Sequence, residues 1–240
     1  MDAAQPMPNG WVKEPIGRVA APLRDQVLQV VRQAILDFEL RPGQRLIERE
    51  LIEQLNVSRA TVREVVARLA AEGLVTIVPQ RGAIVSVISP EEAADIYEMR
   101  VSLEALAVQR FVERASDEHC AALREAFEDL RAEHLGRQNL DQVRAKDAMY
   151  KVLFEGADSP PLTEILTILQ GRVRLLRATS LSAPGRTAEM VKEMQEIVDA
   201  VEARDIPRAT AASALHIRNA ANAAFRRFQD DSEAPAELIV

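Results

Sequence analysis

The sequence has few of the residues on which small secreted proteins and membrane proteins depend. Its 240 residues include one cysteine, Cys120, so it has no second thiol for an internal disulfide or for a zinc site built on several cysteines. No hydrophobic run approaches the roughly 20 residues that a membrane-spanning helix requires. The first residues lack the basic and then apolar pattern of a signal peptide. We therefore expect a globular protein of the cytoplasm that contacts no membrane.

The chain also has fewer basic than acidic residues, which matters for binding to nucleic acid. The chain has 30 basic and 37 acidic residues, a net charge of −7. Residues 21–88 hold nine arginines and eight acids, whereas residues 89–240 hold 19 basic and 27 acidic residues. Overall attraction to phosphates is therefore weak, and binding to nucleic acid must depend on arginines placed locally.

The stretch from Arg45 to Gly82 has the pattern of two short helices, a tight turn and a β-hairpin. Ser58 is a typical N-cap residue, and the helix it begins carries an apolar stripe at helical spacing: Val62, Val65, Val66 and Leu69. Gly73 ends this helix, and residues 74–78 and 83–87 have the composition of strands. This order of elements predicts a winged helix-turn-helix, which binds DNA.

Arginines stand where the second helix would enter the major groove. Arginine matches the O6/N7 edge of guanine with two hydrogen bonds, and base contacts come from the start of a recognition helix. We therefore expect Arg59 and Arg63 to read bases. Neighbouring residues of the two helices and of the hairpin tip are the other candidate DNA contacts: Arg49, Ser58, Ala60, Thr61, Arg81 and Gly82. The alternative is an ordinary helical hairpin with solvated arginines.

The remainder of the chain is expected to be helical. Ser89 and Pro90 suit the N-cap and first position of a helix, so the boundary lies there. No strand pattern follows, and the helical periods cover roughly 90–114, 117–135, 140–157, 161–180, 186–203 and 206–228. We predict a mainly α protein with four parts: a flexible tail (1–20), the winged helix-turn-helix (21–88), an all-α bundle (89–228) and a second tail (229–240).

Three motifs stand out in the first part of the chain: LRPGQRL at 40–46, VSRATVRE at 57–64 and EGLV at 72–75. With these motifs the chain resembles the GntR-type bacterial transcription regulators. The order of domains, with YEMR at 97–100 and EARD at 202–205, is similar to the FadR-type branch. The resemblance implies operator contacts at Arg49, Arg59, Arg63 and Gly82. It also implies a homodimer on double-stranded operator DNA and a C-terminal (FCD) bundle of six or seven helices that dimerises and binds an effector.

Many members of this branch hold a divalent metal through an Asp-x3-His pair and two later histidines. The resemblance places Asp147 and His216 at two of these four positions, but Lys151 and Met194 stand at the other two. A lysine ammonium has no lone pair at neutral pH and repels a cation. We therefore expect the metal site to be lost and no cofactor to be bound.

A lysine in that position could bind a carboxylate directly. Asp147 and Lys151 are four residues apart and share a helix face. We therefore predict a small organic-acid effector, held by a set of candidate residues in the bundle: Arg100, Asp147, Tyr150, Lys151, Arg174, Met194 and His216. The alternative for the first pair is an ordinary surface ion pair.

Three functions are compatible with these patterns. A ligand-responsive transcription regulator is favoured. A constitutive DNA-binding dimer, whose bundle binds no effector, remains an alternative because the metal pattern is broken. An enzyme using Asp147, Lys151 and His216 as acid–base groups is disfavoured, because the sequence has no nucleophile elbow, phosphate loop or cofactor motif.

Overall fold

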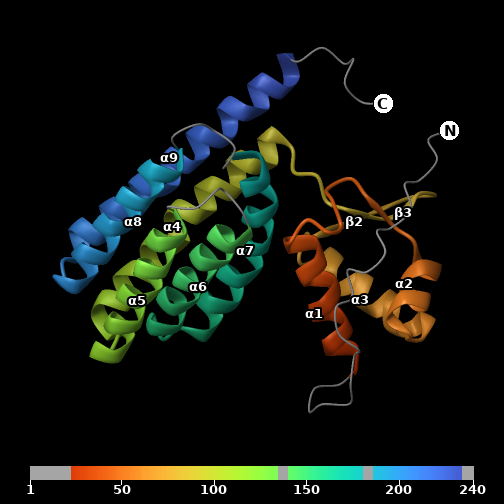
Figure 1. The fold of residues 1–240 in the computed structure, drawn as a ribbon, viewed down its shortest axis with the longest axis horizontal. Coiled ribbons are helices and arrows are strands. Elements are labelled where there is room, and N and C mark those ends of the chain that lie inside the picture. Colours follow the sequence, from red (N-terminus) through yellow and green to blue (C-terminus); the bar gives the residue numbers. More distant parts are fainter. Residues whose placement is uncertain (1–22, 135–139, 181–185, 234–240) are drawn as a thin grey trace. The chain divides into compact units, whose positions relative to one another are not determined.

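The computed structural model describes residues 23–134, 140–180 and 186–233, which are mainly helical (Figure 1). The chain divides into two compact units, the first ending at Ile88 and the second starting at Ser89. The expected tail at 1–20 lies outside the described residues. None of the helices in the described part of the chain is both long and apolar enough to cross a bilayer.

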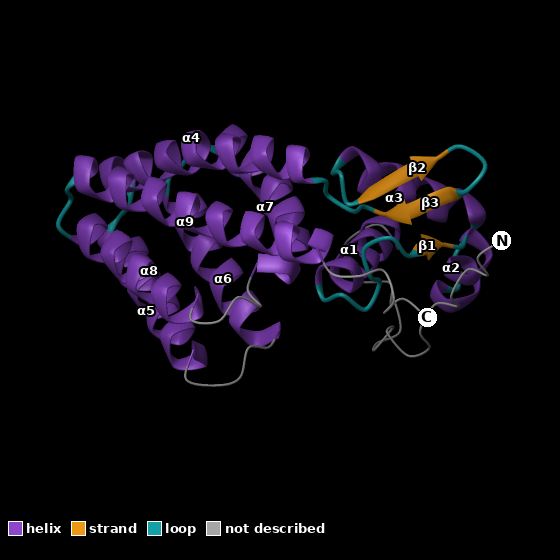
Figure 2. Ribbon diagram, turned by 90° about the horizontal axis from the view of Figure 1, so that it is seen from above, coloured by secondary structure: helices purple, strands orange, loops and turns teal. Residues whose placement is uncertain are grey.

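The first unit is a small helical domain with a three-stranded antiparallel sheet of order β1-β3-β2 (Figure 2). Its elements are α1 (Leu23–Leu36), β1 (Arg45–Leu46), α2 (Glu48–Leu55), α3 (Arg59–Ala71), β2 (Val75–Val78) and β3 (Gly82–Val85). The helix-turn-helix and the hairpin were predicted from the sequence, within one or two residues at their ends. The strand β1 was not, because two residues carry no alternation.

Local sequence signals explain the turn between α2 and α3. Asn56 ends α2 in the left-handed conformation, at φ 51°, which asparagine tolerates better than most residues. Ser58 caps α3, and its hydroxyl accepts a hydrogen bond from the Thr61 N–H at 3.1 Å. The predicted apolar stripe of α3 is buried at all four of its positions: Val62, Val65, Val66 and Leu69. Capping and burial together fix which side of α3 faces solvent.

The second unit is a bundle of helices within the described residues. Its elements are α4 (Pro90–Arg114), α5 (Asp117–His134), α6 (Leu140–Gly156), α7 (Pro160–Ser180), α8 (Arg186–Glu202) and α9 (Ile206–Glu233). The helix α9 packs along α4, α8 and α7, while α5 packs against α6 and α8. The helix α9 continues past its expected end at 228 to Glu233, so the tail expected from 229 onward starts as helix. No glycine or proline follows Phe228 until Pro235, which explains the extension.

A glycine allows α6 to approach α4 closely. A Cβ atom on Gly156 would lie 2.3 Å from Cε2 of Phe111, closer than any side chain tolerates. This contact, together with the burial of Phe111, holds the two helices side by side. It helps to place Tyr150 of α6 within reach of Arg100 on α4.

Candidate functional site

The predicted DNA contacts lie on the solvent side of the first unit. The side chains of Arg49, Arg59 and Arg63 are 79%, 69% and 64% exposed. The other candidates are exposed as well, apart from the half-buried Thr61: Ser58, Ala60, Arg81 and Gly82. The Ser58 hydroxyl is bonded to Thr61, so it caps α3 in addition to any DNA contact.

A carboxylate that the sequence reasoning missed lies beside the two recognition arginines. Glu48, in the first turn of α2, accepts hydrogen bonds from Nε of Arg63 at 3.3 Å through both of its oxygens. The Nε of Arg59 lies 4.0 Å from Oε2 of the same carboxylate. The structure therefore brings Arg59 and Arg63 together around one acid, although that acid is 15 residues from Arg63 in the chain.

Three further arginines of this unit are committed to contacts between α1 and α3. These ion pairs are Arg24–Glu64, Asp25–Arg68 and Arg32–Glu72. These pairs connect α3 and the residue after it with α1. The remaining described arginines of this unit lie in the turn before β1, on β1, on α2, at the start of α3 and in the hairpin turn: Arg41, Arg45, Arg49, Arg59, Arg63 and Arg81.

The hairpin tip carries a second cation that the sequence did not reveal. Gly82 has φ 87°, a conformation that favours glycine, and the Arg45 guanidinium lies 3.9 Å from where its Cβ would be. Arg45 is placed there by β1, which pairs with β3 so that Arg45 faces Ile84. Within the described residues neither Arg45 nor Arg81 forms an ion pair. The wing therefore presents two exposed guanidinium groups.

The interior of the second unit contains a buried polar cluster centred on His216 of α9. The Lys146 Nζ of α6 lies 3.0 Å from His216 Nε2, and Glu193 of α8 lies 2.6 Å from His216 Nδ1. His216 is fully buried, and burial followed by the Lys146 charge lowers its pKa well below the usual value. A neutral ring with its proton on Nδ1 satisfies both contacts: it donates to Glu193 and accepts from Lys146.

The carboxylate of Glu193 ties this cluster to further polar groups. Arg186 donates to both of its oxygens at 2.8 and 3.0 Å, and Asn219 donates at 2.7 Å. Burial alone would raise the pKa of Glu193, but the bonds from His216, Arg186 and Asn219 outweigh burial and lower that pKa to about 2. Glu193 is therefore ionised in the folded protein at neutral pH.

A second buried ion pair lies on α4 and also contacts α6. Arg100 donates to Glu104 at 2.7 Å, and its Nη2 lies 3.3 Å from the Tyr150 hydroxyl. Both charged side chains are only 1% exposed. Burial opposes the charge on Arg100, but Glu104 and the Tyr150 oxygen overcompensate and raise the pKa of Arg100. Arg100 is therefore charged although it is buried in the bundle.

The structure corrects the expected register of α6. Lys151 is 74% exposed and pairs with Glu155 at 3.8 Å, so it lies outside the interior. Asp147 is 28% exposed and accepts from Arg174 at 2.5 Å. The inward pair with the same i, i+4 spacing is Lys146 and Tyr150, one residue earlier and therefore turned by about 100°. Asp147 and Lys151 were expected in the interior because the resemblance places them at ligand positions, and the resemblance does not fix which face of α6 is buried.

Two of the remaining predicted effector residues, Tyr150 and Met194, line a very small cavity. Met194 and Tyr150 line a void of about 10 Å³ together with Met149, Ile197 and Ser213. Such a void holds about one water molecule at most. This void is therefore too small to hold an organic acid.

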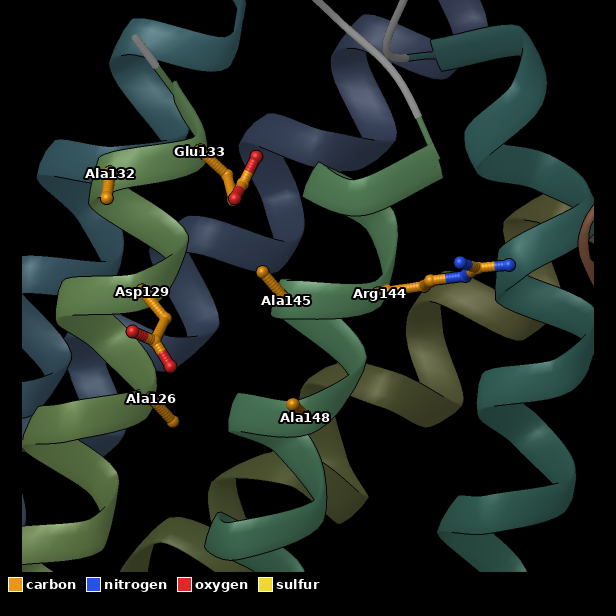
Figure 3. A pocket seen from close by; sticks show the side chains of 7 residues that line it. All are labelled: Ala126, Asp129, Ala132, Glu133, Arg144, Ala145 and Ala148. Carbon is orange, nitrogen blue, oxygen red and sulfur yellow. The ribbon is translucent and has the colours of Figure 1, made fainter. Parts of the chain in front are cut away.

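A larger hollow lies between α5 and α6 but has the wrong chemistry for a carboxylate. Its volume is about 380 Å³, and four alanines line it. Figure 3 shows Asp129 and Glu133 extending from α5 toward α6, whereas Arg144 points away from α5. Its two carboxylates outnumber Arg144, the one cation that lines it among the described residues, so this groove does not suit an anionic ligand.

The residues around His216 do not fit a divalent metal. Its Nε2 faces the Lys146 ammonium, its Nδ1 faces Glu193, and Met194 supplies only a thioether. A metal ligand must have a free lone pair, a thioether is a weak ligand for a divalent metal of this kind, and an adjacent ammonium repels the cation. In the part of the chain that the structure describes, no group of three or more His, Cys, Asp or Glu side chains is placed to hold a metal ion.

Comparison with known proteins agrees with this architecture. Residues 23–85 match the family described as "Bacterial regulatory proteins, gntR family", and residues 95–219, more than half of the chain, match the FCD domain. The HTH-type transcriptional repressor RspR of Escherichia coli K12 is 24% identical over 212 residues, 88% of this chain and 93% of that protein.

Two solved structures have a similar fold. The E. coli protein McbR/YncC superposes with a TM-score of 0.76 at 22% identity, covering 87% of this chain and 99% of that one. A GntR transcriptional regulator from Rhodococcus sp. RHA1 superposes with a TM-score of 0.70 at 23% identity, covering 88% and 98%. At these identities the likeness concerns the fold.

Proposed function

Because this chain belongs to the gntR family of bacterial regulatory proteins and carries the FCD domain, we propose that it is a cytoplasmic homodimer whose operator affinity responds to a small organic acid. The family and its relatives are DNA-binding transcription regulators, so the chain is a transcription regulator and not an enzyme.

On the DNA side, we propose that Arg59 and Arg63 read bases while the wing holds the backbone. Both recognition arginines are exposed at the start of α3, where base contacts form in helix-turn-helix proteins. Arg81 and Arg45 at the wing are exposed and unpaired within the described residues, which suits phosphate or minor-groove contacts. Arg49 on α2 adds a flanking phosphate contact.

A homodimer follows from how little DNA one winged domain can read. Two domains related by a two-fold axis double the base contacts and recognise a pseudo-palindrome. We propose that residues 89–228 hold the two copies together. Light scattering of the full chain at micromolar concentration should give twice the chain mass of 26.6 kDa. A monomer at that concentration would contradict the dimer.

The effector proposal depends mainly on one observation: the buried contact between Lys146 and His216. A buried ammonium requires partners, and a ligand carboxylate is a stronger partner for it than a neutral imidazole. Tyr150, Met149 and Met194 would form the apolar wall of an opened pocket. We therefore propose that Lys146, and not Lys151, contacts the carboxylate of the effector.

The closed cavity makes effector binding a conformational change. An acid can enter only if α6 separates from α8 and α9, so it must bind an open state better than the closed one. That differential affinity is what could alter the spacing of the two winged domains and so the DNA affinity. Ligand binding and operator release then depend on the same equilibrium between the closed and the open state of the bundle.

The test compares two lysines of α6 that differ in burial. A thermal-shift screen of small organic acids on the wild-type chain identifies an acid that raises the melting temperature. Lys146→Met should abolish that shift and the accompanying DNA release, whereas Lys151→Met, at the exposed control position, should keep both. A Lys146→Met variant that still responds at the same concentration would show that the pocket lies elsewhere.

The alternative, a constitutive DNA-binding dimer, is favoured by the small volume of the interior cavity. In that case Lys146, His216 and Glu193 are purely structural. The same screen separates the two functions, because no acid would then shift the wild-type melting temperature.

We also propose that the bundle acts without a metal, because the Lys146 ammonium faces the ring nitrogen that a metal would need. Elemental analysis of protein purified without a histidine tag should find well under one zinc, nickel or manganese per chain. Stoichiometric metal that disappears in His216→Ala would overturn this proposal.

A further inference from the structure

The acid beside the recognition arginines is unexpected on a surface that meets phosphates. Glu48 is 40% exposed, and its contacts with Arg63 and Arg59 are at 3.3 and 4.0 Å. Exposed ion pairs of this kind contribute little to folding stability. A carboxylate here also repels DNA phosphates. Stability and general DNA affinity therefore do not explain its position.

The geometry of the Arg63 contact leaves its base-reading edge available. Both hydrogen bonds to Glu48 use Nε, and Arg63 makes no hydrogen bond through Nη1 or Nη2 within the described residues. The pair of Nη groups is the edge that can donate to guanine O6 and N7 together. Glu48 thus restrains the guanidinium from the side while its terminal edge stays free.

From this arrangement we propose that Glu48 is a specificity-determining residue that positions Arg63, and with it Arg59, for bases and away from phosphates. The carboxylate offsets one of the two positive charges, so it weakens binding to any sequence. It also restricts the arginine side chains, whose free rotation would let them contact any nearby phosphate. The proposal rests on Arg59 and Arg63 reading bases, as proposed above.

The test measures DNA selectivity in a variant that removes only the charge. A duplex selected from a random-sequence pool by the wild-type protein serves as the operator, and a shuffled duplex of the same length and composition serves as non-specific DNA. Glu48→Gln should bind the shuffled duplex more tightly, while its operator-to-shuffled affinity ratio falls about tenfold. A merely structural role would weaken binding to both duplexes.

Glu64→Gln is the matched control, because Glu64 is an exposed acid of α3 that pairs with Arg24 on the α1 side. It makes the same change in net charge, and its affinity ratio should stay at the wild-type value. A Glu48→Gln ratio at or above that of Glu64→Gln overturns the proposal.

Alanine variants of the two arginines distinguish a failure of this proposal from a failure of the DNA-binding surface. If Arg63→Ala and Arg59→Ala lose operator binding while Glu48→Gln keeps its ratio, the surface is right and the role of Glu48 is wrong. If neither arginine variant changes operator affinity, the surface itself is wrong, and the proposal for Glu48 is overturned with it.

Discussion

The two units use the same kind of ion pair in opposite settings. In the DNA-binding unit, Arg63 and Glu48 are 64% and 40% exposed, and their contact is long at 3.3 Å. In the bundle, Arg100 and Glu104 are each 1% exposed, and their contact is 2.7 Å. Water competes for the first pair and is excluded from the second. The free-energy cost of separating the partners is therefore small for the exposed pair and large for the buried pair.

That difference matches what each unit has to do. Arg63 can meet a base through its Nη edge while its Nε stays on Glu48, so reading DNA requires no buried partner to be replaced. A buried cation cannot leave its partner unless another group replaces it. A ligand in the bundle must therefore substitute for an existing partner, which ties its binding to a change in helix packing.

The largest expected effect is a loss of folding stability when Glu193 is replaced. Removing this carboxylate in Glu193→Ala leaves Arg186, His216 and Asn219 without their shared acceptor. We expect a loss of about 3–5 kcal/mol in the free energy of unfolding, measured by urea denaturation. If the variant is too unstable to purify, Glu193→Gln should give a smaller loss in the same direction. A Glu193→Gln midpoint equal to the wild-type value would contradict the view that the cluster needs its charge.

The second largest effect is expected on operator binding, with no change in folding stability. Arg59→Ala and Arg63→Ala should each weaken operator binding by roughly tenfold or more, because a bidentate arginine–guanine contact is worth about 1–3 kcal/mol. Their urea midpoints should match the wild-type value, since both side chains are exposed. Fluorescence anisotropy at fixed salt measures the affinity. A variant that loses both binding and stability would place its arginine in the fold and not at the DNA.

The third effect is a dependence of the folding stability on pH, between pH 7 and pH 5, that originates in the buried cluster around His216. Burial and Lys146 hold the pKa of His216 well below the unfolded value near 6.5. The unfolded chain therefore binds a proton that the folded chain does not, so stability is full above pH 6.5 and falls on acidification. The slope is at most about 1.4 kcal/mol per pH unit for one group. Below about pH 4.5, Glu193 continues the loss because its pKa is about 2.

Urea unfolding between pH 7 and pH 5 tests this pH dependence. His216→Gln should flatten the slope, whereas His119→Gln, at an exposed histidine, should leave it unchanged. A wild-type slope that survives in His216→Gln would assign the titration to another group.

The smallest effect is expected at the surface acid. Glu48→Ala should change the free energy of unfolding by less than about 0.5 kcal/mol, because an exposed pair contributes little. The loss in the free energy of unfolding expected for Glu193→Ala is several times larger. Equal losses at the two sites would remove the contrast between the units.

Part of this protein was predictable from short-range sequence patterns. The helix-turn-helix follows from features within a few residues of one another: the Ser58 cap, the Asn56 turn and the apolar stripe of α3. Exposure of Arg59 and Arg63 follows from the same period, since the buried stripe leaves them on the other side. The order of helices in the bundle could be read in the same way, because turn residues separate them.

The sequence by itself therefore determined the class of fold, the division at Ile88 and the solvent side of the recognition helix, because each depends on local periodicity and capping. Only the tertiary structure decided which face of α6 is buried. Lys146 with Tyr150 and Asp147 with Lys151 have the same spacing, and packing against α4 and α9 selects the first pair. It also decided that Glu48 meets Arg63 and that Arg45 lies beside Gly82, because contacts between distant segments depend on how helices and strands pack and leave no periodic trace in the chain.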